Sequence, residues 1–127
     1  MNRQEREDQT WAETHFGSEP LDPGIIRVLR IFKENGITTT CQSCEGPDGM
    51  QPEGRHGAGH SYRYPTIDVH DWPWKALSVA NDFGIQVDQI SEVFGVREGR
   101  PVEHFWRIEF NSKQLARFRE SWYCEDT

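Results

Sequence analysis

The sequence has no run of apolar residues that approaches the roughly 20 needed to span a bilayer. Its first ten residues, MNRQEREDQT, also lack the apolar core of a secretory signal peptide. Cysteine is scarce: three residues, an odd number in a chain without an export signal, favour free thiols or metal ligands over a disulfide scaffold. We therefore expect a cytoplasmic protein with no membrane contact.

Positive charge is also in short supply. The chain has 14 Lys and Arg against 21 Asp and Glu, which gives a net charge of −7. Because proteins bind phosphate backbones mainly through Lys and Arg, this balance argues against general nucleic-acid binding and favours a protein partner. Aromatic residues are plentiful, with five Trp, seven Phe and three Tyr, which excludes a disordered chain. A length of 127 residues suits one domain with its own core.

The pattern of polar and apolar residues divides the chain into two parts. Residues 1–20 read as a polar N-terminal arm with at most one helical turn, at Thr10–Glu13, docked through Trp11 and Phe16. Residues 21–127 read as a single α+β domain with a long glycine-rich loop at 42–63. No internal repeat or second domain is indicated.

Within that domain the apolar spacings predict the order helix, strand, loop, strand, helix, junction, hairpin, helix. The expected elements are a helix from Asp22 to Gly36, strands at 37–41 and 65–70, a helix that starts at Trp72, a junction at 85–87, hairpin strands at 90–96 and 102–110, and a helix capped by Ser112. Such an order favours an antiparallel or mixed sheet of about four to five strands with helices packed on one face.

The spacing Cys41-x2-Cys44, followed after eleven residues by His56-x3-His60, is typical of zinc ligands. A DNA-reading zinc finger is not expected, because the glycines around the two histidines will not hold a helix. A structural Zn²⁺ site formed by Cys41, Cys44, His56 and His60, with His70 as a possible substitute ligand, is one interpretation. The other is a loop that binds no cofactor.

A second constellation lies where the strand at 37–41 leads into the loop. The candidate binding loop consists of Ser43, Cys44, Glu45, Gly46, Gly59 and His60. A glycine-containing turn after a strand exposes backbone N–H groups that can bind an anion. Cys44 beside His60 or His70 would form a nucleophile and base, with Glu45 orienting the histidine. These residue types make Cys44, His60 and His70 the candidates for catalysis, although we commit to no catalytic residue.

Two further features have ordinary structural interpretations. His104 alternates with Trp106 along a strand and is expected to be a hydrogen-bonded sheet residue. Trp74 has helical spacing with Leu77, Ala80 and Phe83, which predicts a core-facing position, whereas one tryptophan of Trp72-Pro73-Trp74 is expected to remain partly exposed as an interface anchor.

Several of these motifs together resemble a family of small uncharacterised proteins from bacteria and their phages. The family pattern runs GI-x-T, SCEGG-x-GH and PT-x-x-x-H, then a helix and a terminal strand rich in Trp, Glu and Phe. The matching residues between Leu21 and Phe110 are Gly36-Ile37, Ser43–Gly46, Gly59-His60, Pro65-Thr66, His70 and Phe105–Phe110.

This chain departs from the family pattern at Pro47–Ala58, which looks like an insertion, and at the additional Cys41. Cys41 and His56 therefore lie outside the shared motif. Because the zinc site needs both of them, the resemblance favours the candidate binding loop over a zinc site. The resemblance implies no established activity.

Three functions follow as hypotheses. The favoured one is a small acidic binding or regulatory protein of bacterial or phage origin. By analogy with other small phage proteins it would act on a host protein in the host cytoplasm, for example as an inhibitor of defence. The alternatives are a zinc-bound structural domain and a Cys/His-dependent enzyme that acts on a small anionic substrate. An enzyme is the less expected of these classes.

Overall fold

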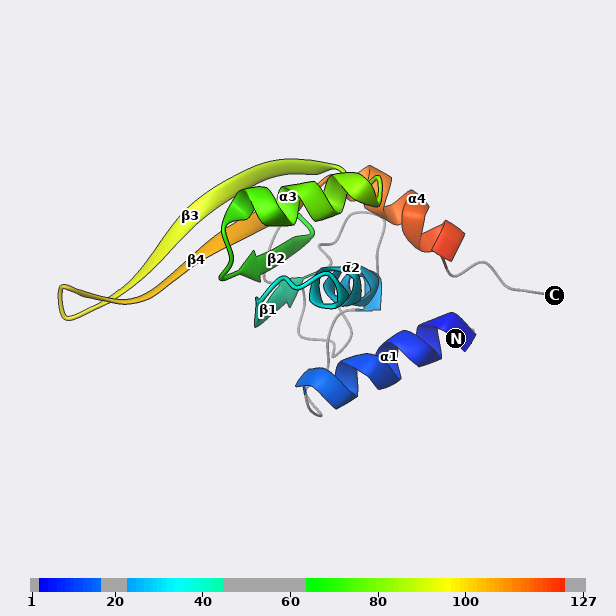
Figure 1. Ribbon diagram of the computed structural model, residues 1–127, viewed down its shortest axis with the longest axis horizontal. Helices are drawn as coiled ribbons and strands as arrows, with labels where there is room; N and C mark the ends of the chain where they lie inside the picture. Colours follow the sequence, from blue (N-terminus) through cyan, green and yellow to red (C-terminus); the bar gives the residue numbers. More distant parts are fainter. Residues whose placement is uncertain (1–2, 17–22, 45–63, 123–127) are drawn as a thin grey trace.

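A computed structural model of the chain describes residues 3–16, 23–44 and 64–122 (Figure 1). The elements are α1 (Arg3–Phe16), α2 (Pro23–Glu34), β1 (Thr39–Cys44), β2 (Thr66–Val69), α3 (Pro73–Asp82), β3 (Val87–Arg97), β4 (Arg100–Phe110) and α4 (Ser112–Trp122). The class is α+β, as predicted. The sheet is antiparallel, with its strands in the order β1-β2-β4-β3. Among these residues, no helix has the length and apolar character of a membrane span.

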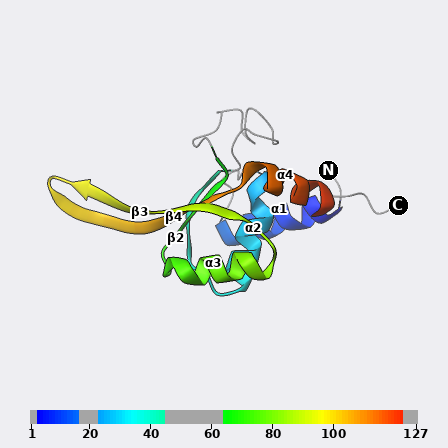
Figure 2. The ribbon, with the colours of Figure 1, turned by 90° about the horizontal axis from the view of Figure 1, so that it is seen from above.

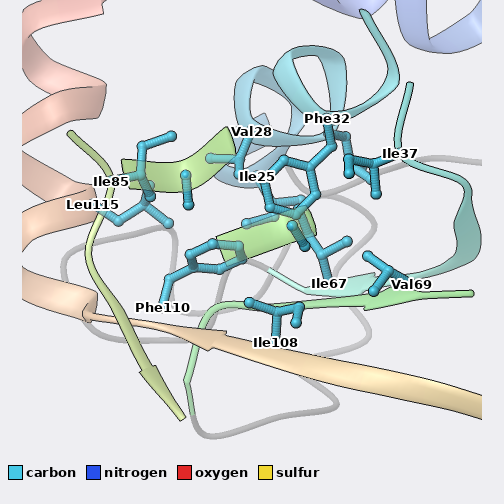
Figure 3. Close-up of a cluster of buried hydrophobic side chains, with 13 residues drawn as sticks. Ile25, Val28, Phe32, Ile37, Ile67, Val69, Ile85, Ile108, Phe110 and Leu115 are labelled. Atoms are coloured by element: carbon cyan, nitrogen blue, oxygen red, sulfur yellow. The ribbon is translucent and has the colours of Figure 1, made fainter. Parts of the chain in front are cut away.

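The core lies between one face of the sheet and helices α2, α3 and α4. Ile67 pairs with Ile108 across β2 and β4, and both side chains are fully buried. Because side chains alternate along a strand, Val69 and Phe110 point to the same face. Figure 3 shows this face meeting α2. The buried helical residues of the cluster are Ile25, Val28, Leu29 and Phe32 of α2, Ala76 and Ala80 of α3, and Leu115 of α4.

β1 differs from the strand predicted at 37–41. It starts two residues later and continues to Cys44, so Ser43 and Cys44 belong to the strand and not to the loop predicted at 42–63. In the pairing with β2, Ser43 lies opposite Ile67 and Cys44 opposite Thr66. Partner strands decide such boundaries more than intrinsic propensity does, and the partner is not visible in the local sequence.

The buried face of α3 also differs from the prediction. Pro73, Ala76 and Ala80 are buried, whereas Trp74 is 62% exposed and Phe83 48% exposed. The small alanines allow the helix to pack closely on the core. The larger residues of the predicted face, apart from the half-buried Leu77, are turned outward.

Residues 3–16 form a helix of 14 residues, which corrects the expectation of a single helical turn. Trp11 and Phe16 pack against the core cluster, as predicted. The helix is anchored by Asp8, which is only 1% exposed and accepts hydrogen bonds from Arg27 (2.9 Å) and Arg30 (3.0 Å) of α2. Sequence reasoning missed this anchor because its partners lie 19 and 22 residues away.

Arg30 is shared between two carboxylates. Its Nε donates to Glu34 at 2.6 Å while its Nη1 donates to Asp8. The bond to Glu34 raises the pKa of Arg30, burial works in the opposite direction, and the bond to Asp8 raises it further. The guanidinium therefore remains charged and continues to neutralise the buried Asp8.

The hairpin turn is shorter than predicted. A loop of about five residues was expected at 97–101, but β3 continues to Arg97 and β4 begins at Arg100. Glu98 and Gly99 alone form the turn, both with positive φ, 53° and 76°. This backbone matches the right-handed twist of the two strands, as in a type I′ turn, so the strands can stay paired to their ends.

The cap of α4 lies one residue earlier than predicted. The Asn111 side chain accepts a hydrogen bond from the backbone N–H of Gln114 at 2.9 Å, which is the bond that an N-cap makes. Ser112 is instead the first residue of the helix, with its hydroxyl buried. Leu115 is buried and both Phe118 and Trp122 pack on the core, as predicted.

We expect Asp8→Ala to destabilise the protein by about 2–4 kcal/mol, because it leaves two arginines without their buried counter-charge. Urea unfolding followed by circular dichroism measures this. Glu7→Ala is the matched control: Glu7 is exposed and lies 3.7 Å from Arg3, so its loss should cost less than about 0.5 kcal/mol. Equal effects of the two substitutions would show that Asp8 does not anchor α1.

We expect Gly99→Ala to destabilise the hairpin by about 1 kcal/mol. Nothing lies within 4 Å of an added Cβ, so the cost comes from the positive φ alone. Glu98→Asn should stabilise it by about 0.5 kcal/mol, since Asn tolerates this conformation and Asn-Gly is a favoured type I′ pair. Thermal unfolding of both variants is the measurement, and a gain in stability for Gly99→Ala would contradict the assignment of the turn.

Candidate functional site

Only part of the candidate loop falls within the structure. Cys41, Ser43 and Cys44 lie on β1, and His70 is an exposed residue directly after β2. The remaining predicted site residues lie outside the described residues: Glu45, Gly46, His56, Gly59 and His60.

The backbone register separates Cys44 from His70. Cys44 pairs with Thr66 at one end of the β1–β2 ladder. At the other end, the backbone N–H of His70 donates to Thr38 O at 2.8 Å. His70 lies four residue steps along the chain from Thr66, which is roughly 13 Å in an extended strand. The ladder therefore does not bring Cys44 and His70 together, and the pairing of Cys44 with His60 stays a prediction.

No group of three or more potential metal ligands is found within residues 3–16, 23–44 and 64–122. The zinc prediction depends on His56 and His60, which lie outside these ranges. It therefore stays a prediction from the spacing of the ligands.

Sequence reasoning missed an exposed aromatic surface on the β3–β4 hairpin. Both views show this hairpin extending away from the body formed by the helices and by β1 and β2 (Figures 1 and 2). In its register, Ile90 lies opposite Ile108 and Phe94 opposite His104. Because opposite residues point to the same side and side chains alternate, the face that is buried at Ile108 continues outward through these positions.

Aromatic rings follow one another along this face. Trp72, just before α3, makes an edge contact with Trp106 of β4, with ring centroids 5.5 Å apart. The Trp106 ring lies 5.7 Å from His104, which stacks on Phe94 at 4.6 Å with nearly parallel planes. His104 Nε2 also lies 3.0 Å from Glu92 Oε2, so this histidine is hydrogen-bonded in the sheet, as expected.

An apolar groove of about 330 Å³ lies at the base of this row of rings. The start of α3 supplies one wall and the hairpin the other, and the lining residues are Trp72, Pro73, Trp74, Ile90 and Trp106. Trp72 and Trp74 are 61% and 62% exposed, so both are available to a partner, whereas only one was expected to be.

We define the aromatic face as Trp72, Trp74, Ile90, Phe94, His104 and Trp106. A tryptophan side chain has a surface of up to about 250 Å². Since Trp72 and Trp74 are 61% and 62% exposed, together they leave roughly 300 Å² of surface accessible to a partner. That area already reaches the size of the largest apolar patch on a typical monomer, which is often functional. Phe94, which is 56% exposed, enlarges it further.

The opposite face of the sheet has a different character. Asp68 of β2 is completely buried and receives two hydrogen bonds from Arg107 of β4, at 2.9 and 3.2 Å. The Arg107 guanidinium also lies over the Phe105 ring, 5.4 Å from its centroid. A buried carboxylate with a bidentate arginine is neutralised in place, so we assign this pair to holding β2 against β4.

Comparison with known proteins identifies no relative. The chain matches no protein-family model, no curated protein and no solved structure.

The zinc prediction is tested by elemental analysis of protein purified without an affinity tag. A site formed by Cys41, Cys44, His56 and His60 requires close to one zinc per chain, and removal of the metal should lower the melting temperature. A zinc content below about 0.1 per chain, with stability unaffected by a chelator, would rule the site out. His104→Ala is a suitable control, because it removes a histidine that the zinc prediction does not use.

Proposed function

We propose that this chain is a small acidic binding or regulatory protein that acts on a protein partner without turnover, and that the aromatic face is its docking surface. The observation that carries the proposal is the unbroken row of rings from the exposed Trp72 through the half-buried Trp106 to the exposed His104 and Phe94, continuous with a groove.

The fixed arrangement of these rings favours binding. Trp72 rests against Trp106 and His104 is fixed between Phe94 and Glu92, so little side-chain freedom remains to be lost on association. Tryptophan is also the residue most often found to dominate the binding energy of protein interfaces. The groove can accept a protruding side chain of the partner, and the exposed indoles beside it can insert into a depression on the partner's surface.

The shape and charge of the molecule support a protein partner. The hairpin extends from the body, so its face is open to approach from a second macromolecule (Figures 1 and 2). The net charge of −7 would repel nucleic acid and would speed the approach of a partner with a basic surface. Given the resemblance to bacterial and phage proteins, we place the partner among host proteins of the cytoplasm, with a component of host defence as one example.

The proposal is tested by site-specific photo-crosslinking. The photoreactive residue p-benzoylphenylalanine is introduced at Phe94, on the aromatic face, and at Phe83, an aromatic of similar exposure at the far end of α3. We expect irradiation in a lysate of the native host to give a discrete adduct from position 94 only, and Trp74→Ala to reduce that adduct at least tenfold.

The same adduct from both positions, or an adduct at position 94 that survives Trp74→Ala, would contradict docking on the aromatic face. Circular dichroism of Trp74→Ala controls for folding. Since Trp74 is largely exposed, the spectrum should remain that of the unmodified protein.

A further inference from the structure

β3 is an edge strand of the sheet formed by the described residues. It spans 11 residues and pairs with β4 on one side, and no other described strand pairs with its outer side. Such an edge presents a row of backbone N–H and C=O groups to a neighbouring chain. Recognition by strand addition uses these groups for affinity and the alternating side chains for specificity.

The central part of β3 offers a regular backbone edge to a neighbouring chain, with one charged side chain, Glu92, in its middle. It contains neither proline nor lysine, and its pairing with β4 is regular from Gln89 to Gly95, with irregularities only outside that range. A strand of about seven residues could therefore be added without distortion.

The groove lies beside this edge. Ile90 of β3 is one of its lining residues, together with Trp74 of α3. A strand added to β3 lies about 4.8 Å away, and every second side chain points to the aromatic face. Side chains opposite Ile90 and Phe94 would thus pack on the groove and on the outer rings, which calls for apolar residues at both positions.

Between these two positions the aromatic face carries a negative charge. Glu92 lies between Ile90 and Phe94 on the same face, and its carboxylate is exposed. It bonds to His104 through one oxygen, and a carboxylate can accept further hydrogen bonds. The side chain opposite Glu92 in an added strand should therefore be basic, because opposite charges directly across a sheet stabilise the pairing.

We propose that the partner contributes an extended segment that adds antiparallel to β3, with the pattern apolar–x–basic–x–apolar on the side of the aromatic face. This inference rests on the proposed function, since it names the part of the partner that the aromatic face recognises. The apolar residue opposite Ile90 occupies the groove, and the basic residue pairs with Glu92.

A second copy of this chain fits the edge less well. In a two-fold antiparallel pairing of β3 with itself, the register that matches Ile90 with Phe94 places the two Glu92 carboxylates opposite each other. Like charges in directly opposite positions destabilise a sheet. The net charge of −7 on each copy adds to the repulsion.

The test uses fluorescein-labelled synthetic peptides and fluorescence anisotropy with the full chain. The first peptide is acetyl-Thr-Leu-Thr-Arg-Thr-Phe-Thr-amide, and the second has Glu in place of Arg. We expect the Arg peptide to bind at least about threefold more tightly. Glu92→Lys should reverse this preference, whereas Glu103→Lys, on the opposite face of the hairpin, should leave it unchanged.

Two N-methylated versions of the Arg peptide test for strand addition itself. One is methylated on the Thr amides and the other on the Leu, Arg and Phe amides. In an added strand only one of these sets points to β3, so one version should lose binding at least tenfold while the other retains it. Equal binding of both versions, or equal loss, would overturn strand addition, as would a concentration-dependent dimer that excludes the peptide.

The outcomes separate this inference from the proposed function. If position 94 yields a partner adduct but the peptides do not bind, the partner docks by another structure and only strand addition fails. If neither experiment gives a signal that depends on the aromatic face, both proposals fail.

Discussion

The structure depends on β4, whose inward face serves two purposes along a single strand. At Ile108 and Phe110 this face is covered by helices and completes the core. At Trp106 and His104 the same face emerges beyond the start of α3 and becomes the aromatic face. Because side chains alternate along a strand, a shift of one residue in register would turn the core residues and the aromatic residues together to the opposite face of the sheet.

One long-range contact and one local turn hold β4 in that register. On its other face, the bidentate pair between Arg107 and the buried Asp68 fixes it against β2. On the side away from β2, the tight turn at Glu98-Gly99 sets the pairing with β3 along the protruding hairpin. The rigid base that presents the aromatic face thus results from a buried charge pair and from a backbone conformation.

The candidate site predicted from the sequence lies between Cys41 and His70, whereas the candidate site found in the structure is the aromatic face on α3 and the β3–β4 hairpin. The sequence indicated the Cys/His motifs because reactive and metal-binding residue types can be recognised without knowledge of their neighbours in space. In the structure, Cys44 and His70 lie at opposite ends of the β1–β2 ladder. Trp74 and Phe94 are apolar residues with the spacing of a core. Whether such residues are covered depends on which elements lie above them, and no local pattern contains that information.

The sequence by itself determined the class of the fold, the helix from residue 23, the hairpin and the docking of Trp11, because hydrophobic period and turn residues are local signals. Tertiary structure alone decided that Asp8 would anchor α1 through Arg27 and Arg30 and that β1 would extend to Cys44. It also decided that α3 would turn Trp74 and Phe83 away from the core. These outcomes depend on contacts between residues far apart in the chain, where the energy of packing and charge pairing outweighs local preference.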